Sequence, residues 1–120
     1  MSLLSEDVIG IELVGYVSNE HADFLHDAIA EFLYQSGAAH VFWDNEAFLR
    51  YDPGIRDAIV QLLHRERSRW EQMYVLFDSP FIGMTTTAAG LILGRRIYRY
   101  RSRAVFMAAV EAALVPGPTP

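Results

Sequence analysis

Four acidic side chains lie at or just beyond the ends of segments that we predict to be β-strands: Asp44, Glu46, Asp52 and Asp78. Ligands of open parallel sheets tend to bind where the strands end, and carboxylate oxygens suit Mg²⁺. Asp44, Asp52 and Asp78 are therefore candidate metal ligands in a Mg²⁺-dependent phosphate-binding protein. In the alternative, which we favour, Asp52 caps a helix, Asp78 belongs to a turn and Asp44 and Glu46 are solvated. No cofactor is then expected.

The chain lacks residues that many enzyme classes require. It has no cysteine, and its ten basic residues are all arginine, which excludes cysteine nucleophiles, thiolate metal sites and Schiff-base lysines. No serine lies in a Gly-x-Ser-x-Gly turn, and no glycine-rich phosphate loop follows a strand. His21 and His26 are five residues apart on a predicted helix and do not share a face. We therefore expect a protein that is not an enzyme.

Charge is unevenly distributed along the chain. Residues 1–60 hold eleven acids and two arginines, whereas residues 61–120 hold four acids and eight arginines. The segment "RRIYRYRSR" (95–103) interleaves arginine with tyrosine, as binders of single-stranded nucleic acid do. In a strand, however, Arg99 and Tyr98 point to opposite faces, and the acidic remainder repels phosphate. We expect an edge strand with charged flanks rather than a nucleic-acid site.

Strand-like and helical patterns alternate four times. The predicted strands cover residues 8–17, 39–45, 72–77 and 95–100. The predicted helices begin after Ser18 or Asn19, at Pro53, at Pro80 and after Ser102. This β-α-β-α-β-α-β-α order predicts an α/β layered domain with a mostly parallel sheet of four or five strands. We expect one domain over residues 1–120, with a core at 7–114 and a frayed tail at 115–120.

The triplet Asp52-Pro53-Gly54 stands where an apolar segment meets an amphipathic one. An aspartate at a helix N-cap accepts the unpaired amide protons of the first turn. Proline suits the first helical position, where no amide proton is needed. We therefore predict that Asp52 caps a helix reaching about residue 69, and that Gly37 ends the helix before it.

The segment "SPFIGMTTTAAGLILG" (79–94) contains no charged residue, although a helix on a sheet normally has a polar side. It is too short to span a membrane, which takes about 20 apolar residues. In one interpretation its threonines form a weakly polar outer surface that faces solvent. In the other, its outer face packs against a second copy, a partner or an apolar ligand. Ile82, Met84 and Thr85 are the candidate contact residues, and methionine adapts to varied partners.

Several of these features together resemble the STAS domain, the fold shared by sulfate transporter tails and bacterial anti-sigma-factor antagonists. They are a strand ending in Asp44-Asn45, the Asp-x-Gly helix start at 52–54, the strand "MYVLF" (73–77) and the segment "GRRIYRYRSRAVFMAAVEAAL" (94–114). The similarity covers about residues 8–114 and is greatest to stand-alone bacterial members.

The resemblance implies a docking surface and the loss of a switch. In the antagonists, a phosphorylatable serine follows the aspartate that begins the second helix, and its phosphorylation controls the docking of a kinase. Here that position is Pro53, which has no hydroxyl, so this chain cannot be phosphorylated at the position that switches the antagonists. The implied docking surface is the loop 46–54 with the exposed side of the next helix. Its candidate residues are Tyr51, Asp52, Pro53, Gly54 and Arg56.

We therefore expect a cytoplasmic, STAS-like regulatory module that binds a protein partner or itself, as a homodimer. Neither a secretion leader nor a membrane span is expected. An alternative is a carrier of a small hydrophobic molecule or lipid, in which the helix at 80–93 covers an apolar cavity above the sheet. A Mg²⁺-dependent phosphate-binding protein is the third hypothesis.

Overall fold

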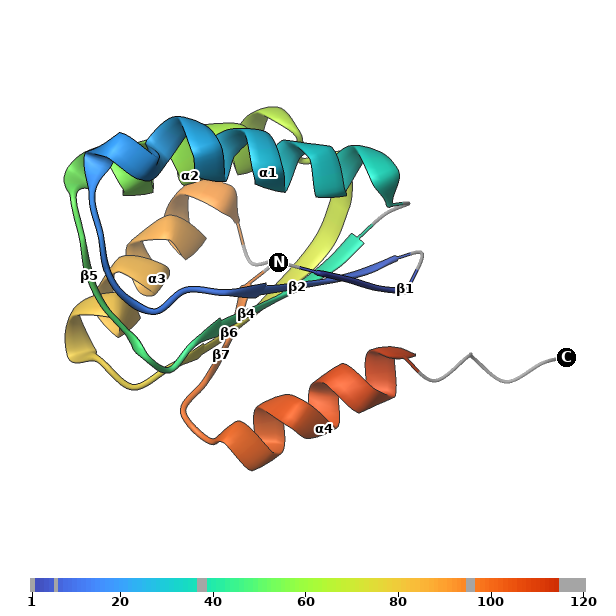
Figure 1. Ribbon diagram of the computed structural model, residues 1–120. Helices are drawn as coiled ribbons and strands as arrows, with labels where there is room; N and C mark the ends of the chain where they lie inside the picture. The colour runs from blue at the N-terminus through green and yellow to red at the C-terminus, as the bar shows by residue number, and fades with distance from the viewer. Residues whose placement is uncertain (1, 6, 37–38, 95–96, 115–120) are drawn as a thin grey trace, which may run out of the picture.

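A five-stranded sheet forms the centre of the domain in the computed structural model, which describes residues 2–5, 7–36, 39–94 and 97–114 (Figure 1). Its strand order is β1-β2-β4-β6-β7. The strands β2 (Val8–Glu12), β4 (Ala39–Asn45), β6 (Trp70–Phe77) and β7 (Ile97–Tyr100) are mutually parallel. β1 (Ser2–Ser5), which the sequence did not predict, pairs antiparallel with β2. The predicted α/β class with a mostly parallel sheet is confirmed.

Two further strands form a separate parallel pair. β3 (Gly15–Val17) runs beside β5 (Phe48–Tyr51), so the prediction of one continuous strand over residues 8–17 is wrong. The chain turns out of the large sheet because Gly15 has a φ angle of 70°, a conformation that glycine adopts without steric cost. The Gly15 amide then donates to the Ala47 carbonyl, 2.7 Å away, and this bond starts the second pair.

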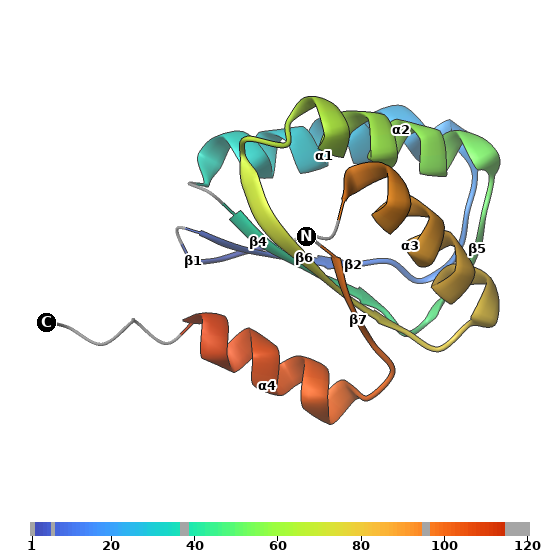
Figure 2. The same cartoon turned by 180° about the vertical axis from the view of Figure 1, so that it is seen from behind.

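Helices cover both faces of the large sheet (Figures 1 and 2). A 3₁₀ turn (Asn19–His21), α1 (Ala22–Gln35), α2 (Pro53–Arg65) and α3 (Pro80–Leu93) lie on one face, and α4 (Arg103–Leu114) lies on the other. The four predicted helices are confirmed, although α2 ends at Arg65 rather than near residue 69. Gly37, Arg95, Arg96 and the predicted tail at 115–120 lie outside the described residues.

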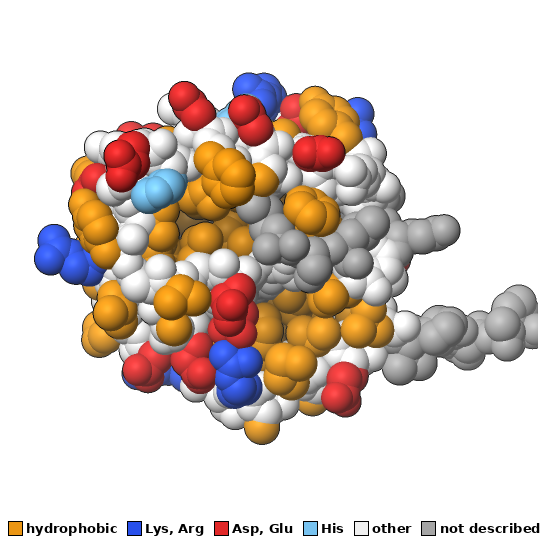
Figure 3. Space-filling view, in the orientation of Figure 1, with side chains coloured by type: hydrophobic (Ala, Val, Ile, Leu, Met, Phe, Trp, Pro, Cys, Tyr) orange, Lys and Arg blue, Asp and Glu red, His pale blue; other side chains and the backbone are white. Residues whose placement is uncertain are grey.

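Two apolar cores lie on opposite faces of the sheet. The larger fills the space under α1, α2 and α3, and includes Ile29, Val41, Ile55, Leu62, Trp70, Met73 and Ile82. The smaller, under α4, consists of Val8, Phe42, Leu76, Phe106 and Val110. Hydrophobic side chains also reach the surface over α1 and around α4, among charged side chains (Figure 3). Both sheet faces are thus apolar, as the near-continuous apolar strands require.

The alternation predicted for the last strand is confirmed over residues 97–100. Tyr98 and Tyr100 both stack on Tyr74, on the side of the sheet that α4 covers. Arg99 points to the other side, where its guanidinium donates to the Thr87 hydroxyl of α3. Arginine and tyrosine therefore do not form one continuous face along this strand.

No helix in the described part of the chain has the length and hydropathy to cross a membrane.

Candidate functional site

The helix starts at Asn19 and Asp52 cap each other. Asp52 occupies the N-cap position of α2 and Pro53 the first helical position, as predicted. The Asp52 carboxylate accepts hydrogen bonds from the backbone amide of Asn19, at 2.9 Å, and from the Tyr16 hydroxyl. In return, the Asn19 side-chain oxygen accepts from the Gly54 amide, also at 2.9 Å. Each helix start thereby supplies a cap to the other.

The prediction that the Asp52 carboxylate caps its own helix is therefore wrong. No side-chain cap bond links Asp52 to the first turn of α2. The pairing of β3 with β5 explains the difference, because it places Asn19 beside the first turn of α2. The Asp52 amide donates to the Val17 carbonyl at 3.1 Å, which fixes this arrangement.

Gly54 lets the Asn19 side chain approach the first turn of α2 closely. A Cβ atom added at Gly54 would lie 2.4 Å from the Asn19 side-chain oxygen. Replacing Gly54 with alanine is therefore expected to displace the Asn19 side chain and to lower the free energy of unfolding by about 0.5–1.5 kcal/mol, the usual contribution of one hydrogen bond. Gly90→Ala is the matched control, because a Cβ there meets nothing within 4 Å and alanine favours a helix. Urea denaturation of both variants measures the difference, and a Gly54→Ala variant as stable as Gly90→Ala would contradict the mutual capping.

The same contacts shift two pKa values. The hydrogen bonds from the Tyr16 hydroxyl and the Asn19 amide lower the pKa of Asp52. The bond to Asp52 raises the pKa of the Tyr16 hydroxyl. Hydrogen bonds to an ionised carboxylate favour the charged form, so Asp52 stabilises the fold as an anion.

This shift predicts a pH-dependent loss of stability. A carboxylate whose pKa is lower in the folded state contributes stability that is present above its unfolded-state pKa, about 3.9, and disappears as the pH falls through the folded-state value. The stability advantage of the wild type over Asp52→Asn is thus expected to be constant above about pH 5 and to shrink in more acidic solution. Tyr16→Phe, which removes the main cause of the shift, should reduce the pH dependence. Urea titrations between neutral and acidic pH test both, and a pH-independent difference would contradict the assignment.

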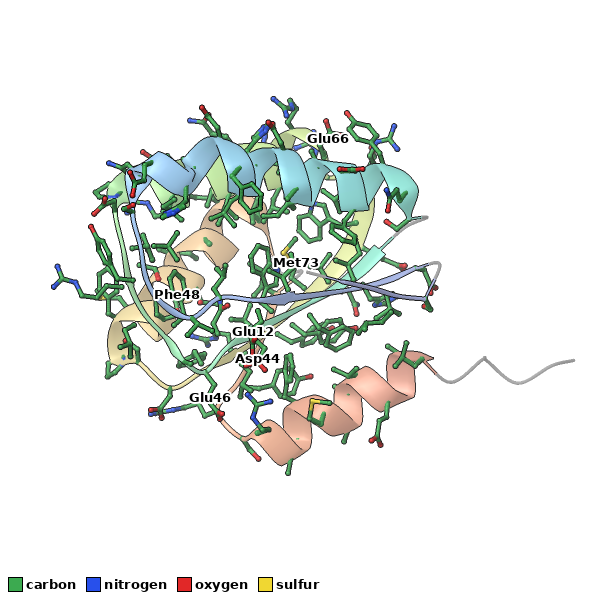
Figure 4. The ribbon with its side chains drawn as sticks, in the orientation of Figure 1. Glu12, Asp44, Glu46, Phe48, Glu66 and Met73 are labelled. Atoms are coloured by element: carbon green, nitrogen blue, oxygen red, sulfur yellow. The ribbon has the colours of Figure 1, made fainter. Side chains whose placement is uncertain are left out.

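Arg103 joins α4 to the end of β4. Its Nη2 atom lies 2.9 Å from both carboxylate oxygens of Asp44, and its Nε atom lies 2.9 Å from Glu46 Oε1. These hydrogen bonds raise the pKa of Arg103. Figure 4 shows Asp44 and Glu46 close to the start of α4, with Glu12 beside them, and Glu12 is the β2 neighbour of Asp44. Asp44, Glu46 and Arg103 thus form an ion-pair network.

The three candidate metal ligands are not brought together. Asp44 pairs with Arg103, Asp52 binds Asn19 and Tyr16, and Asp78 lies exposed after β6. Among the described residues, no group of three or more His, Asp or Glu side chains is placed so that it could hold a metal ion. The geometry offers no support for these residues as a shared Mg²⁺ site.

The outer face of α3 is apolar and exposed. Its large exposed side chains are Phe81, Met84, Leu91 and Ile92. Ser79 caps the helix by accepting from the Ile82 amide, and the helix begins at Pro80 as predicted. Ile82 itself points inward and is only 2% exposed, so its expected place on the outer surface is wrong. The Thr85 hydroxyl bonds to the Phe81 and Ile82 carbonyls and is part-buried.

The predicted docking loop adjoins this face of α3. The Tyr51 ring packs between Phe48 and Phe81, with ring centroids 5.7 Å and 5.3 Å away. Pro53 is exposed, and the exposed Arg56 pairs with Asp57 at 3.3 Å. The contact between Tyr51 and Phe81 connects the 46–54 loop to the outer face of α3.

Between α2, α3 and the sheet lies a pocket of about 100 Å³ with a mostly apolar lining. Two of the residues that line it, Asn45 and Tyr51, each carry a buried side-chain oxygen (Asn45 Oδ1 and the Tyr51 hydroxyl oxygen) that has no hydrogen-bond partner within the described part of the chain.

The sequence did not identify Asn45 as a pocket residue, and it did not predict the contacts of Tyr16, Asn19 and Arg103. Of these residues, only Asn19 has a recognisable sequence signal, because asparagine is a common N-cap and a predicted helix begins near it.

Comparison with models of known protein families found no match, and comparison with curated proteins found none either.

Proposed function

We propose that this protein is a STAS-like regulatory module that is not an enzyme and that binds protein through the outer face of α3, in the first instance a second copy of itself. The observation that carries the proposal is the exposure of Phe81, Met84, Leu91 and Ile92 on a helix without a charged residue. Contiguous exposed apolar surface of this kind commonly marks an interaction site.

Self-association suits this face because it is uncharged. In a symmetric dimer the same patch of each copy meets its partner, so a charged face would set like charges against each other. The outer face of α3 avoids this repulsion. By contrast, the exposed Phe24 and Tyr34 of α1 share their helix with Asp23, Asp27 and Glu31.

The alternation of strands and helices, the Asp52 helix start and the adjoining 46–54 loop support the STAS-like assignment. In the STAS antagonists the residue after the helix-start aspartate is the phosphorylated serine. Pro53 occupies that place here and has no hydroxyl to modify. The proposed module is therefore regulated by association at α3 and the neighbouring loop, without phosphorylation at this position.

Met84→Glu tests the docking surface. Met84 is 64% exposed, so the new carboxylate stays solvated in the monomer but is buried and repelled by its copy in the dimer. The dimer dissociation constant is expected to rise at least tenfold, as for the loss of a central apolar anchor. Sedimentation velocity across a dilution series measures it.

Val105→Glu is the matched control, because Val105 is an exposed apolar residue on α4, across the sheet. It should leave the dissociation constant unchanged. A dimer insensitive to Met84→Glu but disrupted by Val105→Glu would contradict the proposal and place the interface on α4.

A further inference from the structure

The pocket between α2, α3 and the sheet has a polar end and an apolar end. Asn45 ends β4 and Tyr51 ends β5, so both come from the edge where the strands finish. Leu63 and Leu93 come from the last turns of α2 and α3, and Met73 lies opposite Ile97 near the starts of β6 and β7; all four line the pocket. Figure 4 shows Phe48 on the β5 side and Met73 further along the sheet, both beneath the helices.

The polar end contains two buried groups without a protein partner. Asn45 is 7% exposed, and neither its side-chain oxygen nor the Tyr51 hydroxyl has a hydrogen-bond partner among the described residues. Buried polar groups are normally bonded, and leaving one unsatisfied lowers stability. The hydroxyls of Thr85 and Thr86, which also line the pocket, differ from them because they donate to the Ile82 carbonyl.

We propose that this pocket binds one small amphiphilic molecule, whose single neutral hydroxyl group lies at Asn45 and Tyr51 and whose apolar body lies among Leu63, Met73 and Leu93. A hydroxyl group can donate to the Asn45 oxygen and accept from the Tyr51 hydroxyl. Its bonds would satisfy both groups and recover the stability that their burial removes. The site lies at the strand-end edge where open parallel sheets bind ligands.

The lining favours a neutral head group. Among the described residues that line the pocket, Arg56 is the one charged residue, and it is exposed and paired with Asp57. A carboxylate bound at Asn45 and Tyr51 would therefore be buried without a cation beside it, which is unfavourable.

The volume limits the size of the body. An engineered apolar cavity of about 150 Å³ holds a benzene molecule, so a pocket of about 100 Å³ encloses about four carbons. The pocket opens to the surface, so the rest of a six-carbon chain reaches out of its open side.

The probe is 1-hexanol, titrated into ¹⁵N-labelled protein and followed by NMR. We expect saturable shifts of amides that line the pocket, and binding at least tenfold tighter than that of hexanoate, which has the same chain with a charged head. Shifts that do not saturate up to the solubility of 1-hexanol would overturn the pocket as a site. Tighter binding of hexanoate would overturn the neutral head group.

Tyr51→Phe keeps the ring and removes only the hydroxyl. The unliganded variant should be as stable as the wild type, or more so, because that hydroxyl has no partner to lose, while its affinity for 1-hexanol falls about five- to tenfold, the effect of one neutral hydrogen bond. Tyr98→Phe, on the other side of the sheet, should leave the affinity unchanged. A less stable unliganded Tyr51→Phe, or one with undiminished affinity, would overturn the role of Tyr51.

Met84 does not line the pocket, so Met84→Glu should still bind 1-hexanol. Binding of 1-hexanol and formation of the dimer are therefore tested independently.

Discussion

Replacing Ile82 with glutamate is expected to unfold the domain, whereas the same change at Met84, two residues later, leaves it folded. Ile82 is 2% exposed within the larger core, and Met84 is 64% exposed on the same helix. Losing a buried isoleucine side chain alone costs about 2–5 kcal/mol, and an unpaired buried carboxylate costs more. The total stability of a domain is only about 5–15 kcal/mol.

Thermal melting followed by far-UV circular dichroism compares the two variants. We expect a cooperative transition near that of the wild type for Met84→Glu and none for Ile82→Glu. If Ile82→Glu melted cooperatively near the wild-type temperature, Ile82 would lie outside the core. The side of α3 proposed as the docking face would then be the wrong one.

Replacing Phe106 with alanine is expected to lower the free energy of unfolding by about 3–5 kcal/mol, the range for deleting a buried aromatic side chain. Phe106 and Val110 are the buried residues of α4. Phe106 contacts Phe42 and Tyr100 edge to face, with ring centroids 5.8 Å and 5.9 Å away. Phe106 is the larger of the two buried residues, and the ion pair through Arg103 is partly exposed, so it contributes little.

Val105→Ala is the neighbouring control, since Val105 is exposed and surface changes are usually within about 0.5 kcal/mol. Urea denaturation measures both variants, and hydrogen exchange of the α4 amides shows whether the helix detaches. Equal stabilities of the two variants would mean that Phe106 does not anchor α4 to the sheet.

The parts of the fold that were predicted correctly depend on local signals. Ser79-Pro80 and Ser102 mark helix starts through residue types that cap the first turn, and their hydroxyls accept the expected amides of Ile82 and Val105. The apolar stripe after Pro53 and the apolar strands at 39–45 and 72–77 can also be recognised from a few consecutive residues.

The parts that were missed depend on contacts between distant segments. The bond from the Asn19 amide to Asp52 joins residues 33 apart in sequence, and it exists only because β3 pairs with β5. A helix start such as Asp52-Pro53 shows that a cap is needed but not which side chain supplies it. Similarly, Arg103 belongs to a basic run in the sequence, and only the packing of α4 brings it to Asp44.

The candidate docking face was predicted in part. The absence of charge in residues 79–94 indicated an unusual helix, but apolar residues on all its sides left its orientation open. For this reason Ile82 and Met84 received the same role, although one faces the core and the other the surface. The carrier hypothesis expected an apolar cavity between the helix at 80–93 and the sheet, but the residues that line the pocket could not be predicted, because they come from strands and helices spread along the chain.

Native mass spectrometry of the unmodified protein, over the full range of concentrations at which it stays dissolved, tests whether the protein self-associates. If the outer face of α3 binds a second copy, the spectrum shows a dimer of the 13.6 kDa chain that gives way to monomer on dilution. A spectrum of monomer alone at every concentration would contradict self-association through α3.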